Sequence, residues 1–288
     1  MAPSLRASPR LGSVAVAWPR RGVVFASLCA LGFVNGIVSR VASAIAGDPW
    51  GAVFNTFGIS ALVWVAIGYC IGTMLQSTGD VRHGDLRIGF GALTAFLVPL
   101  EPLSWIALTA LAFHLLHQAA PSGTDGDSPL YRAAWILLGI TGAMFWGGVL
   151  LTLMSDVVLQ AETAAVSWLV GVPRQGNTLA FADGNGYVWI AASCSSVANV
   201  SLVLLCWIMF SQHRRLRWSV VGAGWCLFAV VSVIAINAVR IGMIVLLRDW
   251  FDLLHGPVGA FVVGWLIVIV TIAICAAGTS HVARLARR

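Results

Sequence analysis

The chain has 288 residues, of which 59% are hydrophobic and 10% are charged, and its mean hydropathy is +0.90. A water-soluble domain contains about 25% charged residues, so this composition excludes a cytosolic enzyme and predicts a protein of the lipid bilayer. All 17 basic residues are arginine, and they lie in short clusters between long apolar runs, a pattern that sets membrane orientation and indicates no nucleic-acid partner.

The N-terminal region consists of a basic tail, residues 1–21, and a first apolar run near residues 22–46. Basic residues before an apolar run that ends in the triplet Ala44–Ala46 also fit a cleavable signal peptide. Arg40 interrupts the run just before this triplet, however, and the run is long enough to serve as a span. We therefore predict a cytoplasmic tail followed by an uncleaved first transmembrane helix.

Further apolar runs approach or exceed the roughly 20 helical residues that cross about 30 Å of hydrocarbon. They lie near residues 51–75, 133–154, 195–211, 218–240 and 257–277. Residues 88–117 are too many for one ordinary span, and Pro99, Glu101 and Pro102 interrupt them in the middle. This region is either two short spans or a re-entrant hairpin.

The arginines favour two crossings in this region, because positive residues in short loops stay on the cytoplasmic side. With about eight spans and both ends inside, the inner side holds Arg6, Arg10, Arg20, Arg21, Arg82, Arg87, Arg132, Arg214, Arg215, Arg217, Arg284, Arg287 and Arg288. Only Arg40, Arg174, Arg240 and Arg248 fall in or near the outer face.

The sequence therefore predicts an all-α polytopic protein of the cytoplasmic (inner) membrane with about eight transmembrane helices. About five of these lie in residues 22–154, and the rest lie in a C-terminal catalytic region, residues 194–280. Residues 281–288 form a cytoplasmic tail, and PSGTDGDSP is a flexible inner connection.

The longest segment outside the spans, residues 155–193, lies on the outer side in this topology. The run SDVVLQAETAAVSWLVGV places apolar residues at roughly helical spacing among polar ones, which predicts an interfacial helix. The residues Asp183–Gly186 stand between two β-prone runs and predict the turn of a hairpin. An interfacial helix and a short β-hairpin thus precede Cys194.

Four polar residues from three late segments are expected at one membrane level, on the extracytoplasmic side. Cys194 lies at the outer mouth of a span, about 26 Å of helix from the inner HRRLR cluster, and the other five cysteines lie inside spans. Asn237 and Arg240 lie about 28 to 33 Å along the next span and share one helix face. His255 precedes Pro257, whose position suits the first turn of the last span.

A thiol, an imidazole and a guanidinium at one depth are the groups that nucleophilic acyl transfer requires. Taken singly, an outer arginine also fits a headgroup anchor, a loop histidine a solvated side chain and a helix-end cysteine a space-filling residue. Their convergence favours catalysis. The sequence has no cluster with metal-ligand spacing and no phosphate-binding glycine loop, so we predict no metal and no cofactor.

The segment GNTLAFADGNGYVWIAASCSSVANVSL, followed by INAVRIG and HGPVGAF, resembles the exosortase/archaeosortase family of polytopic membrane cysteine transpeptidases. The resemblance covers residues 155–277 best. It implies that Cys194 is the nucleophile, Arg240 its electrostatic partner, His255 the acid/base and Asn237 a supporting residue. The family commonly has a glycine where this chain has Ser196, so the subfamily and its recognition motif stay open.

The resemblance also implies the substrates, which are membrane-anchored proteins with a C-terminal sorting signal made of a short motif, a transmembrane helix and a basic tail. Cleavage would pass through a thioacyl intermediate, and the acceptor would be water or an amine on a lipid or polysaccharide carrier. Two alternatives to a cysteine protease or transpeptidase remain. One is a small-solute transporter, which would need intramembrane polar residues along a pathway, and the other is a non-catalytic membrane subunit of a polysaccharide synthesis or export system.

Overall fold

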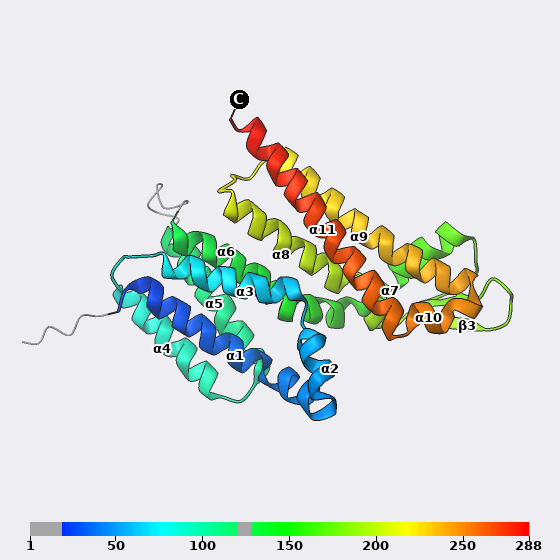
Figure 1. The fold of residues 1–288 in the computed structure, drawn as a ribbon, viewed down its shortest axis with the longest axis horizontal. Helices are drawn as coiled ribbons and strands as arrows, with labels where there is room; N and C mark the ends of the chain where they lie inside the picture. Colours follow the sequence, from blue (N-terminus) through cyan, green and yellow to red (C-terminus); the bar gives the residue numbers. More distant parts are fainter. Residues whose placement is uncertain (1–18, 120–127, 288) are drawn as a thin grey trace, which may run out of the picture.

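The fold is nearly all-α, as predicted. In this computed structural model, residues 19–119 and 128–287 are described, and the chain is 81% helical with one small antiparallel sheet (Figure 1). Arg6, Arg10, Arg288 and residues 121–127 of the predicted inner connection lie outside the described residues.

The elements follow one another without a second domain of different architecture. The helices are α1 (Arg21–Gly47), α2 (Pro49–Phe54), η1 (Thr56–Gly58), α3 (Ala61–Leu75), α4 (His83–Leu97), α5 (Glu101–Ala119), α6 (Pro129–Thr141), η4 (Gly142–Trp146), α7 (Gly147–Val170), η5 (Ala192–Cys194), α8 (Val197–His213), α9 (Val220–Leu246), η6 (Arg248–Trp250), α10 (Phe251–His255) and α11 (Pro257–Leu285). Between α7 and η5 lie the strands β1 (Arg174–Gln175), β2 (Thr178–Ala180) and β3 (Tyr187–Trp189), paired in the order β1-β2-β3.

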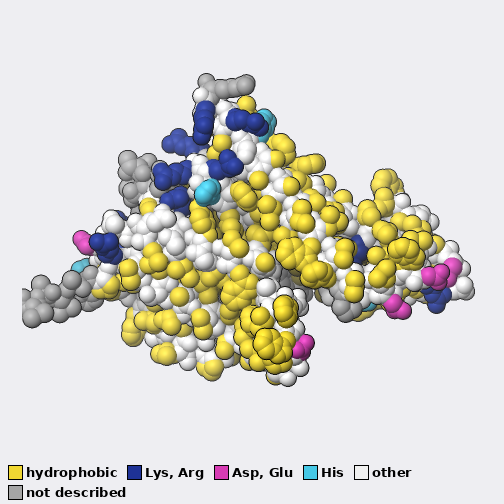
Figure 2. Space-filling view, viewed as in Figure 1, with side chains coloured by type: hydrophobic (Ala, Val, Ile, Leu, Met, Phe, Trp, Pro, Cys, Tyr) yellow, Lys and Arg dark blue, Asp and Glu magenta, His cyan; other side chains and the backbone are white. Residues whose placement is uncertain are grey.

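The long helices alternate in direction between two ends of the molecule. At one end, the Tyr69 hydroxyl, late in α3, lies 3.1 Å from Nδ1 of His213 at the end of α8. At the same end, the indole of Trp225, early in α9, donates to His281, late in α11, at 3.0 Å. We call this the arginine-rich end, because the helix termini gathered there carry Arg20, Arg21, Arg82, Arg87, Arg132, Arg214, Arg215, Arg217, Arg284 and Arg287 (Figure 2).

At the opposite end, late α1 meets the start of α5. The indole of Trp105 donates to the carbonyl of Gly36 at 3.2 Å, and the hydroxyl of Ser39 donates to Glu101 at 2.5 Å. The three-stranded sheet, the C-terminal part of α9 and α10 extend from this side of the molecule (Figure 1). The sequence-predicted functional residues belong to these elements.

Four helical stretches within the described residues are long and apolar enough to cross a membrane. They are Arg21–Gly47, Pro129–Val170, Val220–Leu246 and Val258–Leu285, while Ala61–Leu75 and Val197–His213 are shorter apolar helices. Large exposed apolar side chains cover the flanks of the bundle (Figure 2), as expected of a surface that contacts lipid. These features indicate a membrane protein, and the count of about eight spans stays a prediction.

The predicted continuous span over residues 51–75 is wrong. The chain leaves the helical conformation after α2, with Phe57 at φ 58° and Gly58 at φ 67°, and α3 begins only after Ser60. The Ser60 side chain accepts a hydrogen bond from the backbone amide of Leu62, which caps the new helix. The remaining helix has 15 residues and is about 22 Å long.

Residues 88–117 form parts of two helices, α4 and α5, that pack against each other. The break falls where Pro99 was expected to cause one. Val98 is extended, at φ −84° and ψ 124°, because a proline disfavours the helical conformation in the residue before it. Both helices run between the arginine-rich end and the opposite end.

The predicted span 133–154 and the predicted interfacial helix are not separated by a loop. They form one helical stretch, Pro129–Val170, with a π-helical turn at η4. Met154 has non-helical angles, φ −119° and ψ 18°, so the direction of α7 changes at the predicted boundary between residues 154 and 155. The helix ends at Gly171, whose φ of 71° suits glycine.

A buried ion pair holds three helices together at the arginine-rich end. Asp85 of α4 is 1% exposed and accepts from Nε of Arg21 at 2.7 Å and from Nη2 of Arg21 at 2.9 Å. The side chains of His114 and Gln118, both in α5, also contact this carboxylate, at 3.0 and 3.1 Å. The charge of Asp85 is therefore paired and hydrogen-bonded from α1 and α5.

We expect Asp85→Ala to lower the free energy of unfolding by about 3 kcal/mol, because Arg21 would keep a largely buried charge without its partner. Thermal unfolding in detergent micelles measures the effect. Asp80→Ala, at an exposed position before α4, is the matched control. Equal melting temperatures for the Asp85 and Asp80 variants would contradict the assignment.

Candidate active site

Cys194 ends a short 3-10 turn, η5, directly before α8. Its backbone amide donates to the carbonyl of Ala191 at 2.9 Å, and the amide of Ser195 donates to Ala192 at 3.1 Å. The thiol is free and the residue is half-buried against a small apolar cluster that includes Leu159. The local backbone thus fixes the place of the sulfur while leaving the residue accessible.

Asn237 joins α9 to this turn. Its side chain is 4% exposed, and its Nδ2 donates to the backbone carbonyl of Cys194 at 2.7 Å. A buried amide must make such a bond, because an unpaired polar group inside a protein costs about 1–3 kcal/mol. Asn237 therefore restrains the residue that carries the thiol.

Arg240 joins the same face of α9 to α10. Its Nε and Nη2 donate to the carbonyl of Leu254, at 3.3 and 3.2 Å. The next residue, His255, ends α10 and is exposed, and its ring stacks on Phe251 with 5.1 Å between the ring centres. Arg240 therefore contacts the backbone beside the histidine.

The structure brings together all four predicted residues through one face of α9. Asn237 contacts Cys194 and, three residues later, Arg240 contacts the residue before His255. Within the described part of the chain, the thiol of Cys194 and the imidazole of His255 are not hydrogen-bonded to each other. Catalytic hydrogen bonds often form only in the substrate complex, so this arrangement is compatible with a thiol and base pair.

The loop between β2 and β3 is fastened to the C-terminal end of α9. Nη1 of Arg248 donates to Asp183 at 3.2 Å and to the carbonyl of Asn185 at 2.7 Å. The amide of Ala182 donates to the carbonyl of Val245 at 3.1 Å. This loop therefore leads the chain into the Cys194 turn from a fixed position.

The loop also contains a carboxyl whose ionisation supports its attachment. The hydrogen bond from the backbone amide of Asn185, together with Arg248, lowers the pKa of Asp183 below its ordinary value of 3.8. The stabilisation is complete above that value and is lost as the pH falls through the lower pKa of the folded state. The loop stays attached throughout the neutral range.

Sequence reasoning missed Glu162, which lies on α7. Its Oε1 accepts from the hydroxyl of Ser195 at 3.1 Å, and from the amide and hydroxyl of Ser196 at 2.9 and 2.5 Å. One signal pointed to it: Glu162 shares helical spacing with the buried residues Leu159 and Val166, so it belongs to the buried face of α7.

These bonds separate the cysteine from the neighbouring serines. Ser195 and Ser196 are 6% and 4% exposed, and their hydroxyls are held by Glu162, whereas Cys194 is half-buried. Ser196, where a glycine was expected from the resemblance, has φ −74° and ψ −9°, angles that any residue adopts. The thiol is therefore the more accessible nucleophile.

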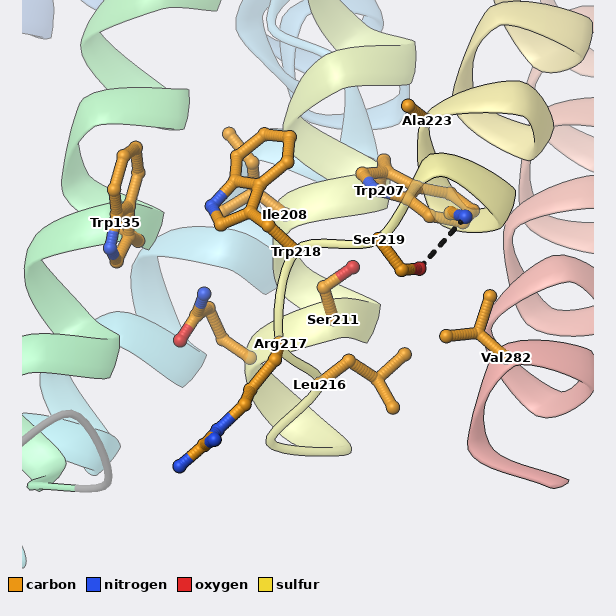
Figure 3. A pocket seen from close by; sticks show the side chains of 12 residues that line it. Trp135, Trp207, Ile208, Ser211, Leu216, Arg217, Trp218, Ser219, Ala223 and Val282 are labelled. Atoms are coloured by element: carbon orange, nitrogen blue, oxygen red, sulfur yellow. Dashed lines mark hydrogen bonds between the residues drawn. The ribbon is translucent and has the colours of Figure 1, made fainter. Parts of the chain in front are cut away.

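Two cavities lie away from these residues. One, of about 40 Å³, is at the arginine-rich end, where Trp207, Trp218 and Arg217 contribute to its lining (Figure 3). The other, of about 400 Å³, is lined by residues of α1, α5, η4 and α7, among them Arg40 and Glu101. Neither is lined by the four predicted residues.

Among residues 19–119 and 128–287, no group of three or more His, Cys, Asp or Glu is arranged to hold a metal ion. Comparison with protein-family models, with curated proteins and with solved structures finds no match for this chain. The family resemblance therefore stays a prediction, and we base the function on contacts within the chain.

Proposed function

We propose that the chain is a membrane-embedded cysteine protease or transpeptidase of the exosortase/archaeosortase type. In this proposal it cleaves C-terminal sorting signals of secreted, membrane-anchored proteins at the outer face of the cytoplasmic membrane. The observation that carries the proposal is the pair of contacts from one face of α9, from Asn237 to Cys194 and from Arg240 to Leu254. They hold a thiol turn and a histidine helix beside one guanidinium.

The proposed reaction has two stages. His255 takes the proton of the Cys194 thiol, the sulfur attacks the substrate carbonyl, and Arg240 stabilises the oxyanion. The C–N bond breaks, and the leaving amine receives the proton from His255, which leaves a thioester. Water or an amine on a lipid or polysaccharide carrier then attacks this thioester and gives its proton to His255, and the thiol is restored. The thiol and the imidazole must approach each other when substrate binds.

The proposed orientation puts the arginine-rich end in the cytoplasm, according to the positive-inside rule. The alternating directions of α1, α3, α4, α5, α6, α8, α9 and α11 support about eight crossings, although α3, α4 and α6 are short for a bilayer of ordinary thickness. Cys194, Arg240 and His255 then face the extracytoplasmic side. A substrate anchored by its own C-terminal helix would present the peptide just outside the membrane.

A membrane-impermeant maleimide applied to intact cells tests this function against its rivals. We expect Cys194 to be labelled from outside, and Arg240→Ala or His255→Ala to slow labelling at least about threefold, because a neighbouring positive charge and a base favour the reactive thiolate. Cys194→Ala supplies the background. A thiol that is inert, or that reacts equally in all variants, would instead support a transporter or a non-catalytic subunit.

Asn237 offers a second test, at the level of geometry. We expect Asn237→Ala to reduce substrate processing about tenfold, because the carbonyl of Cys194 would lose its hydrogen bond and the turn its restraint. Asn237→Asp, which replaces the donor by an acceptor, should be at least as slow. The processing rate of a tagged substrate measures both. Asn199→Ala, on α8, is the control, and equal rates for all three variants would show that the contact is irrelevant to activity.

A further inference from the structure

Glu162 connects α7 to the residues directly after the proposed nucleophile. A single oxygen, Oε1, accepts three hydrogen bonds, from the hydroxyl of Ser195 and from the amide and hydroxyl of Ser196. The carboxylate therefore binds both the turn that ends at Cys194 and the residue that precedes α8. It does so from a helix more than thirty residues earlier in the chain.

The helix that carries Glu162 is itself held in place. Leu159 and Val166 on the same face are 6% and 1% exposed, and Thr163 donates to the carbonyl of Leu159 at 2.6 Å. α7 also packs against α9 and contacts η5. The position of Oε1 is thus set by α7, on which the Cys194 turn does not lie.

The second carboxylate oxygen has an unusual position. Oε2 of Glu162 is buried and has no hydrogen-bond partner among the described residues. A buried acceptor left unpaired destabilises the fold by about 1–3 kcal/mol, and charged groups by more. A residue selected only for stability would not carry this cost, whereas unsatisfied groups are tolerated where a site needs a fixed geometry.

We propose that Glu162 is a positioning residue for Cys194 and that it acts through the place of Oε1. This inference rests on the proposed role of Cys194 as nucleophile. The carboxylate fixes the backbone of residues 195 and 196, and so fixes the direction from which the thiol meets the substrate carbonyl. A displacement of about 1 Å at a reacting atom lowers the rate about a hundredfold.

Three variants separate the place of the acceptor from its charge. Glu162→Gln keeps an oxygen at Oε1 and replaces the oxygen that makes no hydrogen bond, so we expect the kcat of substrate processing to stay within about threefold of the native value. Glu162→Asp keeps the charge but withdraws the acceptor by about 1.5 Å. Glu162→Ala removes it. For Asp and Ala we expect kcat to fall about 10- to 100-fold with KM within about threefold.

A second readout needs no substrate. The alkylation rate of Cys194, followed by peptide mass spectrometry with a membrane-impermeant maleimide, should match the native rate in Glu162→Gln and differ at least about threefold in the Asp and Ala variants. Gln160→Ala, at an exposed position of the same helix, is the matched control. Thermal unfolding of each variant verifies that the helix bundle is intact.

The outcomes distinguish this inference from the proposed function. If Cys194→Ala still processes substrate but alkylation follows the expected order, the proposed function is wrong and the positioning of the thiol by Glu162 stands. If alkylation and kcat are the same in all variants, Glu162 does not position the thiol. If Glu162→Gln is as slow as Glu162→Ala in a folded protein, the charge is what matters, and the inference is overturned.

Discussion

Cys194→Ala should abolish substrate processing, with uncut, membrane-anchored substrate accumulating and a rate loss of about 10⁴-fold or more. The reason is chemical: without the sulfur no thioester forms, and the buried hydroxyls of Ser195 and Ser196 are occupied by Glu162. Pulse-chase analysis of a tagged substrate in cells measures the loss.

The matched control is Cys226→Ala. Cys226 is also half-buried but lies near the start of α9, toward the arginine-rich end, so its removal should leave processing within about twofold. Cys194→Ser tests the element, because a hydroxyl of the same shape is a far weaker nucleophile than a thiolate at neutral pH. Normal processing in Cys194→Ala would refute the nucleophile assignment.

Arg240→Ala should reduce kcat about 10²- to 10³-fold, the loss found when one donor to a developing oxyanion is removed. Arg240 also donates twice to the carbonyl of Leu254, so its removal frees α10 beside His255. Arg240→Lys should recover little activity, because an ammonium group is a point charge and cannot reproduce the planar fork of two donors. Single-turnover processing rates of purified protein in detergent measure these losses.

Arg174→Ala is the control for Arg240. Arg174 is exposed on β1, and its guanidinium reaches the carbonyl of Gly176 at 3.4 Å, within the same turn. Its removal changes the net charge by the same amount without touching α9 or α10. Full activity of Arg240→Lys would mean that charge alone suffices, and equal losses in Arg174→Ala and Arg240→Ala would mean that the effect is not local.

Long apolar runs predicted the helices well wherever no special backbone angle intervenes. α1, α8, α9 and α11 begin within about two residues of the expected positions, and the break before Pro99 follows from the proline itself. The division of residues 51–75 was missed, because it depends on left-handed angles at Phe57 and Gly58 inside an otherwise apolar run. Hydropathy does not register such a break.

Within the candidate site, helical spacing was enough to place Asn237 and Arg240 on one face of α9. Spacing did not reveal that both side chains bind backbone carbonyls, of Cys194 and of Leu254, because such contacts depend on how α9 meets two other segments. Glu162 was missed for the same reason. Its partners lie more than thirty residues away, and only its position on the buried face of α7 signalled a role.

The four arginines assigned to the outer face prove to differ in their surroundings. Arg40 lies 3.7 Å from Glu101, Arg248 holds the β2–β3 loop through Asp183, and Arg174 is exposed. Arg240 alone of the four contacts the segment that carries His255. Charge counting could separate the inner from the outer arginines, and only the contacts distinguish the catalytic candidate among them.

Mass spectrometry of the protein incubated with a substrate peptide and quenched in acid tests the nucleophile directly. We predict an acyl group on Cys194, with the mass of the N-terminal substrate fragment, that hydroxylamine removes because it is a thioester. No such adduct should form on Cys194→Ala or on the other cysteines. Cleaved substrate with no acyl group on Cys194, or with an adduct on a different residue, would contradict the mechanism.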